Sequence, residues 1–115
     1  MLVPGPAKKI TIHFNEDTSS RRDYLSHEVL DLLLKLGVAG ATLFRPEVGF
    51  GSHHRIHAAQ ESGIDADRHM PLRIEFIDTE ENVDALLPLL RELVTDGLIE
   101  AQDTVILQAA VAKGQ

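Results

Sequence analysis

Two successive parts of the sequence repeat the same order of patterns, and this repetition restricts the fold more than any other feature. In each part a segment of alternating apolar and polar residues is followed by a longer segment with apolar residues at helical spacing, and then by a second short apolar segment. Alternation with a period of two is typical of a strand with one buried face, and a repeat of about 3.6 residues is typical of an amphipathic helix. The sequence therefore predicts the order β-α-β-β-α-β.

The first part predicts a strand, a helix and a second strand. Residues 10–14 alternate as a strand does, and residues 41–45 form the second predicted strand. Ser20 with Asp23 is a capping pair for the start of the helix, and Gly37 is a typical helix end. The apolar face of this helix consists of Leu25, Val29, Leu32, Leu33 and Leu36.

The second part repeats this order. Pro71 opens the third predicted strand, because proline is tolerated at a strand start. Asp78 with Glu81 is a second capping pair, for a helix that ends at Gly97. The apolar positions of this helix are Val83, Leu86, Leu87, Leu90, Leu93 and Val94. Residues 104–112 are apolar and contain β-branched side chains, and they form the predicted fourth strand.

This order predicts an α+β, ferredoxin-like sandwich, in which a four-stranded antiparallel sheet carries two helices on one face. The first and third strands then lie at the centre of the sheet, and Thr11, His13, Arg73 and Glu75 lie on its uncovered face. A fourth strand that is apolar on both faces is normally buried on both. We therefore expect an oligomer that covers the open face, and the alternative is a monomer with an irregular last strand.

The chain of 115 residues is long enough for one domain. We expect an N-terminal arm over residues 1–6, where two prolines and a glycine oppose regular structure, and a single domain over residues 7–112. The stretch 46–70 shows no period and is long for a connection within a compact domain, which favours a functional loop.

Composition excludes several classes of protein. The absence of cysteine excludes disulfides and thiolate chemistry. The 11 basic and 18 acidic residues give a net charge of −7, which argues against general nucleic-acid binding. No apolar run reaches the roughly 18 residues that a membrane helix needs, so we expect no direct membrane insertion. The start lacks the pattern of a signal peptide, and we expect a cytoplasmic protein.

Basic groups gather in the middle of the chain, where residues 45–73 contain four arginines and four histidines against four acids. This bias favours a small anionic ligand, for which Arg45, Gly49, Phe50, Gly51 and Arg55 are the candidate binding residues. Glycine lets the backbone approach a phosphate or an adenine, and arginine pairs with anions. The alternatives are that the Gly-Phe-Gly segment is a loop hinge and that Arg45 pairs with an acid of a neighbouring subunit.

His53, His54 and His57 are candidate metal ligands, because their spacing can supply imidazoles to a metal ion. No cysteine completes such a set, although Glu61 offers a carboxylate, and the alternative is a solvated polar loop. The sequence shows no nucleophile with a partner base and a pocket, so we do not expect an enzyme.

Three segments resemble the PII-like family catalogued as domain of unknown function 190: Lys8 to Glu16, Gly37 to Gly51, and Met70 to Asp78. The resemblance covers roughly residues 7–107, and its most specific part is the Gly-Ala-Thr segment followed by Gly-Phe-Gly. It implies a ferredoxin-like homotrimer related to the PII signalling proteins, with nucleotides bound in the clefts between subunits. It also places the loop 46–70 where PII proteins have their signalling loop.

One position departs from the family pattern. The family usually has glycine where this chain has Pro46, and proline lacks the N–H donor that a phosphate-binding backbone would use. Some members of the family are encoded beside ion-channel genes, which implies a membrane transporter or channel as the target protein.

Three functions are compatible with these observations. The first is a regulatory trimer that binds a small anionic ligand, such as an adenine nucleotide, between subunits and signals through the loop 46–70. The second is a metal-binding trimer of the ion-tolerance type that uses the three loop histidines. The third is an assembly domain without a small ligand.

Overall fold

The computed structural model of the chain describes residues 2–15, 24–50, 57–58 and 70–109. Its elements are, in chain order, β1 (Gly5–Asn15), α1 (Leu25–Lys35), β2 (Thr42–Phe44), β3 (Val48–Gly49), β4 (His57–Ala58), β5 (Pro71–Asp78), α2 (Glu80–Leu93) and β6 (Gly97–Ile106). One antiparallel sheet has the strand order β2-β5-β1-β6, and β3 pairs with β4 separately. The predicted ferredoxin-like α+β fold is confirmed, with β1 and β5 at the centre of the sheet. No helix in the described part of the chain is long and apolar enough to cross a membrane.

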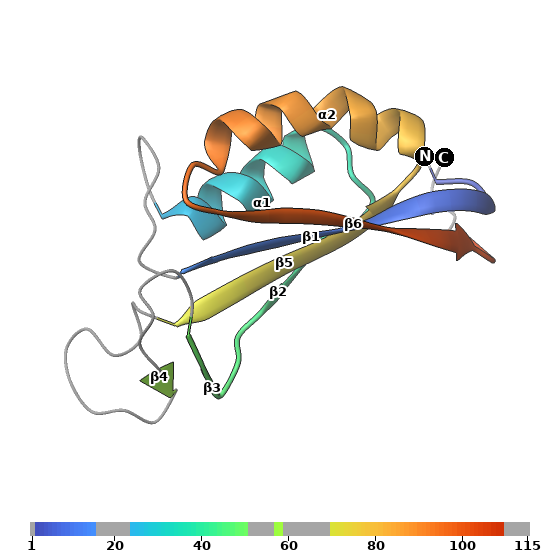
Figure 1. The fold of residues 1–115 in the computed structure, drawn as a ribbon. Helices are drawn as coiled ribbons and strands as arrows, with labels where there is room; N and C mark the ends of the chain where they lie inside the picture. The colour runs from blue at the N-terminus through green and yellow to red at the C-terminus, as the bar shows by residue number, and fades with distance from the viewer. Residues whose placement is uncertain (1, 16–23, 51–56, 59–69, 110–115) are drawn as a thin grey trace.

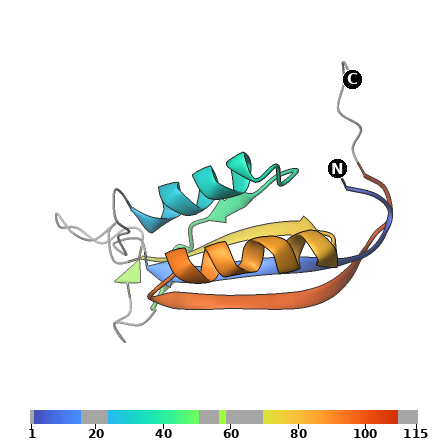
Figure 2. The ribbon, with the colours of Figure 1, turned by 90° about the horizontal axis from the view of Figure 1, so that it is seen from above.

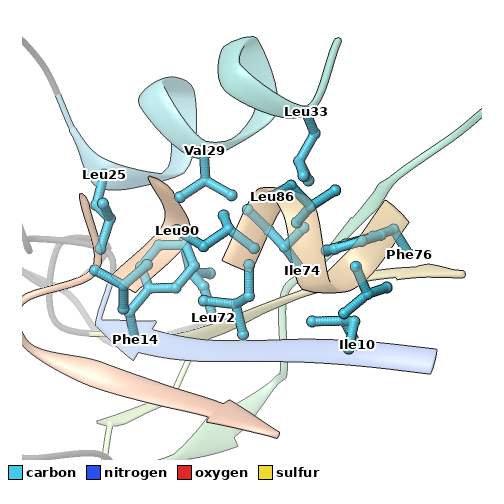
Figure 3. Close-up of a cluster of buried hydrophobic side chains, with 13 residues drawn as sticks. Ile10, Phe14, Leu25, Val29, Leu33, Leu72, Ile74, Phe76, Leu86 and Leu90 are labelled. Atoms are coloured by element: carbon cyan, nitrogen blue, oxygen red, sulfur yellow. The ribbon is translucent and has the colours of Figure 1, made fainter. Parts of the chain in front are cut away.

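Both helices cover the same face of the sheet (Figure 1), and from above they lie side by side, α1 nearer β2 and α2 nearer β6 (Figure 2). The alternation along the central strands produces this layer. Ile10, Ile12 and Phe14 of β1 and Leu72, Ile74 and Phe76 of β5 are each 5% exposed or less. They pack against Leu25, Val29 and Leu33 of α1 and against Leu86 and Leu90 of α2 (Figure 3).

The end of α1 agrees with the prediction, and its start needs no capping side chain. Gly37 follows the helix with φ of 79°, a left-handed conformation that glycine adopts without strain. At the start, Tyr24 is the N-cap residue and makes no side-chain capping hydrogen bond. The predicted capping residues Ser20 and Asp23 lie outside the described residues.

The cap of α2 corrects the predicted pair of Asp78 and Glu81. Thr79 is the N-cap residue, and its Oγ1 accepts a hydrogen bond from the backbone N–H of Asn82 at 3.3 Å. Asp78 supports this cap, because its Oδ1 accepts from the backbone N–H of Thr79 at 2.7 Å and from the side-chain amide of Asn82 at 2.9 Å. These bonds satisfy a carboxylate that is only 4% exposed.

The position of the fourth sheet strand was predicted wrongly. The sequence favoured residues 104–112, whereas β6 spans Gly97–Ile106 and shares only its last three residues with that segment. As an edge strand, β6 pairs with β1 alone, and most of its side chains are exposed. The apolar run begins where the strand ends, and Val105 and Leu107 are 60% and 87% exposed. The argument for an oligomer that rested on a strand buried on both faces therefore does not hold.

Two other boundaries differ from those expected. β1 begins at Gly5, inside the predicted arm 1–6, because residues 5–7 pair with residues 104–106 of β6. The stretch 46–70 contains the short pair of β3 and β4, in which Gly49 stands opposite His57. The equivalence of this stretch to a signalling loop stays a prediction.

Gly97 begins β6 at a close approach between two strands. A Cβ at this position would lie 2.5 Å from the backbone carbonyl oxygen of His13. We expect Gly97→Ala to lower the free energy of unfolding by about 1–3 kcal/mol, the usual range for overpacking. The control is Gly40→Ala, whose Cβ would meet no heavy atom within 4 Å. Urea denaturation measures both variants, and equal effects would contradict the close approach.

Candidate functional site

One row of side chains crosses all four strands on the face that the helices leave open. The register pairs Phe44 of β2 with Arg73 of β5, Arg73 with His13 of β1, and His13 with Leu98 of β6. The next row on this face consists, in the same strand order, of Thr42, Glu75, Thr11 and Glu100. All four residues predicted for the open face belong to these two rows, because side chains alternate between the faces of a sheet.

Arg73 is held by its neighbours on this face. Its Nε lies 3.1 Å from Oε2 of Glu75, and its guanidinium carbon lies 4.3 Å from the centroid of the Phe44 ring. The other carboxylate oxygen of Glu75 lies 3.5 Å from Nζ of Lys9. An ion pair and a cation–π contact therefore fix the plane of the guanidinium group.

His13 is held in a similar way by an acid of the second row. Its Nε2 lies 3.0 Å from Oε1 of Glu100, and the two side chains are 41% and 46% exposed. An ionised carboxylate can only accept a hydrogen bond, so the imidazole donates through Nε2. This bond fixes the orientation of the ring next to Arg73.

Lys8, the neighbour of Lys9, shows that the opposite side of β1 serves another purpose. Its ammonium group pairs with Asp103 of β6. The hydrogen bond to Asp103 is the main cause that raises the pKa of Lys8 above its ordinary value, and Glu80 and Asp84 of α2 add to it. This pair joins the β1–β6 edge to the helix layer and lies away from the open face.

A cavity of about 710 Å³ opens over the first row, at the end of the sheet from which β3 and β4 extend (Figure 1). Its walls come from the ends of β1 and β2, the starts of β5 and β6, and the segment 44–50. These parts meet because antiparallel neighbours bring the end of one strand beside the start of the next.

The cavity wall combines positive charge with aromatic rings. The described lining residues include the bases His13, Arg45 and Arg73, the acid Asp96, and the rings of Phe44 and Phe50. Glu75 and Glu100, the partners of Arg73 and His13, do not line it. Such a wall fits an anionic group that is attached to a flat, largely apolar group.

Two of the five predicted ligand-binding residues lie at this cavity. Arg45 lines it directly after β2, and Phe50 lines it with 60% of its surface exposed. Gly49 lies beside it, and a Cβ there would be 2.9 Å from Cγ of the proline that begins β5. Gly51 and Arg55 lie outside the described residues. A ligand-binding role for these five residues stays a prediction.

The predicted metal site falls mostly outside the described part of the chain. His53 and His54 are not among the described residues, and His57 belongs to β4. Within the described ranges, no group of three or more His, Cys, Asp or Glu side chains could hold a metal ion.

Three residues of the wall were not predicted as ligand-binding residues. His13 and Arg73 were expected at a subunit contact, and Phe44 was treated only as part of a strand. The alternation in β1 and β5 places His13 and Arg73 on one face, and this was the available signal. Alternation does not fix the register that sets them opposite each other, so their meeting at the cavity could not be found from the sequence.

Solved structures with this architecture are PII-like proteins. The chain aligns with CPII, a nitrogen regulatory PII-like protein from Thiomonas intermedia K12, with a TM-score of 0.59 and 19% identity over 94% of each chain. It aligns with TTHA0516, a PII-like signaling protein from Thermus thermophilus, with a TM-score of 0.64 and 20% identity over 93% of this chain and 94% of that one. The fold is therefore the PII-like form of the ferredoxin-like fold.

The sequence comparisons identify the family. A model of the DUF190 family, described as an uncharacterized ACR, matches residues 7–106. The UPF0166 protein MJ1524 from Methanocaldococcus jannaschii is 28% identical over 111 residues, which are 95% of this chain and 94% of that protein. The chain belongs to the DUF190 family, as the resemblance of its segments implied.

The contact between Arg73 and Phe44 predicts an energetic coupling between the two side chains. In a double-mutant cycle with Arg73→Met and Phe44→Leu, we expect a coupling of about 0.5–1 kcal/mol, the range for a cation–π contact at an exposed site. The control cycle replaces Phe44→Leu by Phe50→Leu and should give a coupling near zero. Urea denaturation at one fixed protein concentration measures both, and equal couplings would show that the stacking is not specific.

Proposed function

We propose that this protein is a PII-like regulatory protein that binds a small anionic ligand in the open-face cavity and signals the bound state through the segment 46–70. The specific ligand that we propose is an adenine nucleotide. The observation that carries this proposal is the presence of two arginines and two phenylalanine rings in the wall of one cavity of about 710 Å³.

The size and the chemistry of the cavity support this ligand class. Pockets for small molecules usually have volumes of about 300–1,000 Å³. The guanidinium groups of Arg45 and Arg73 match the oxygens of a phosphate, and an aromatic ring offers a stacking surface to a purine. Phe44 already carries the guanidinium group of Arg73, so Phe50 is the ring that we propose for stacking.

The solved relatives support a nucleotide and a moving segment. CPII has been solved with ADP, AMP and bicarbonate bound, and also in its apo form. In the present chain, Arg45, Pro46 and Phe50 belong both to the cavity wall and to the connection between β2 and β5. A ligand that contacts these residues can change the order of the segment that they begin, which is a known mode of switching.

We further propose that the protein forms a homotrimer with the cavities at the clefts between subunits. On the open face, Phe44, Ile77 and Leu98 are 38%, 37% and 57% exposed, and sister copies would cover them. In this proposal the protein works in the cytoplasm without catalysing a reaction. Its target is a membrane transporter or channel rather than a nucleic acid.

Binding of ADP should raise the melting temperature of the protein by several degrees, since a ligand at 100 times its Kd stabilises by about 2.7 kcal/mol. Arg45→Met and Arg73→Met should each weaken binding about tenfold or more, because hydrogen bonds to charged groups contribute about 1.5–3 kcal/mol. The control is Lys35→Met, whose ammonium group pairs with Asp31 on α1. Calorimetric titration measures the affinities.

Two results would contradict this assignment. An equal loss of affinity in the Lys35 variant would mean that general charge, and not the cavity, binds ADP. A melting shift with divalent metal ions alone, absent with ADP and removed by His54→Ala with His57→Ala, would replace the proposal by the metal-binding function.

The proposed assembly predicts a particle of three copies of the 12.7 kDa chain in light scattering. Leu98→Asp should shift the protein towards monomers, because it places a charge on the open face. The control is Leu34→Asp, at a side chain of α1 that is 76% exposed. A monomeric wild type, or dissociation by the Leu34 substitution alone, would place the contact elsewhere.

A further inference from the structure

Two cationic side chains stand next to each other on the cavity wall. His13 and Arg73 are paired in the register of β1 and β5, and opposed residues of antiparallel strands have Cα atoms about 4.5–5.5 Å apart. Each contacts a carboxylate that does not line the cavity, Glu100 for His13 and Glu75 for Arg73. The carboxylates thus orient the two cations without adding negative charge to the wall.

The bond to Glu100 decides which imidazole nitrogen can meet a ligand. Nε2 of His13 carries the hydrogen in the 3.0 Å contact, because the ionised carboxylate only accepts. In the neutral ring, Nδ1 is then an acceptor, and its lone pair repels an anionic oxygen. Nδ1 becomes a donor only when the ring takes up a proton. An anion that contacts Nδ1 of His13 therefore binds together with a proton.

The charges around His13 favour this coupling. From β6 and the turn before it, Glu100 contacts the ring and Asp96 lines the same cavity. From β5, Arg73 stands opposite the ring, with Glu75 one row behind, and Arg45 belongs to the same cavity wall. The two arginines oppose a further positive charge on the ring, and an anion bound among the three groups removes this repulsion.

We infer that His13 is a ligand-binding residue of this cavity, that its protonated ring and Arg73 together hold a phosphoryl group, and that ligand binding takes up a proton. This inference rests on the proposed function and adds to it a residue, a ligand group and a pH dependence. A phosphoryl group carries about 1.5–2 negative charges and three acceptor oxygens, which suits two adjacent cations better than a carboxylate does.

Isothermal titration calorimetry of the full chain with ADP tests this inference. Titrations at pH 7 in two buffers with different ionisation enthalpies give the number of protons taken up per bound ADP. We expect on the order of half a proton for the wild type, because histidine side chains change charge between pH 5 and 8. The phosphate of ADP has its own pKa of about 6 and contributes equally in every variant, so the differences between variants are the result.

Three variants separate the role of His13 from other effects. His13→Gln cannot titrate and should lose the share of the uptake that comes from the protein. His13→Lys stays charged over this pH range, so it should bind ADP at pH 8 at least as tightly as the wild type and also lose the uptake. His27→Gln removes a histidine of α1 that does not line the cavity and should behave as the wild type. Melting curves show whether each variant is folded.

Glu100→Gln provides a readout that leaves His13 in place. A neutral amide favours the charged ring less than a carboxylate does, so more protons should be taken up when ADP binds. Uptake in this variant equal to that of the wild type would contradict the role given to the bond at Nε2.

The outcomes distinguish this inference from the proposed function. If His13→Gln takes up as many protons as the wild type and His27→Gln, the inference is overturned, while the proposed function stands because ADP still binds. If ADP binds to no variant and not to the wild type, at either pH 6 or pH 8, the proposed function fails and the inference fails with it.

Discussion

The antiparallel pairing of β1 with β5 is the constraint on which the rest of the molecule depends. This register sets Ile12 opposite Ile74 and, one position further along β1, His13 opposite Arg73. Because side chains alternate between faces, the first pair enters the helix layer and the second lies on the open face. Burial of each large apolar side chain stabilises the fold by about 1.5–3 kcal/mol. The apolar half of the pairing therefore determines where the polar half stands.

The ionic contacts of the open face contribute orientation more than stability. Glu75 is shared between Lys9 and Arg73, and its side chain is 20% exposed, whereas the side chains of His13 and Glu100 are both more than 40% exposed. Ion pairs in such positions add little to the free energy of unfolding. Their effect is to hold two cations in one row with defined planes before any ligand arrives, which lowers the entropy lost on binding.

The parts of the structure that depend on local pattern could be predicted, and the parts that depend on pairing between distant segments could not. The alternation of β1 and β5, the apolar faces of both helices and the stop at Gly37 all follow from sequence spacing. β6 was misplaced because its polar residues, such as Glu100 and Gln102, form an edge strand through backbone pairing with β1. At the site, Arg45 and Phe50 were found from a local motif, whereas the contact of His13 with Glu100 depends on a register that no local pattern encodes.

Gly97 has two neighbours whose demands coincide, since it starts β6 against the carbonyl oxygen of His13 and also forms part of the cavity wall. At this point the wall is bare peptide backbone. Stability and recognition cannot be varied independently there, because a side chain that altered the wall would first push the two strands apart. The same is not true of the row that contains Arg73 and Phe44, where side chains can be exchanged on an intact sheet. Divergence in ligand preference among descendants of such a chain would accordingly be written in the strands, while the turn before β6 remains small.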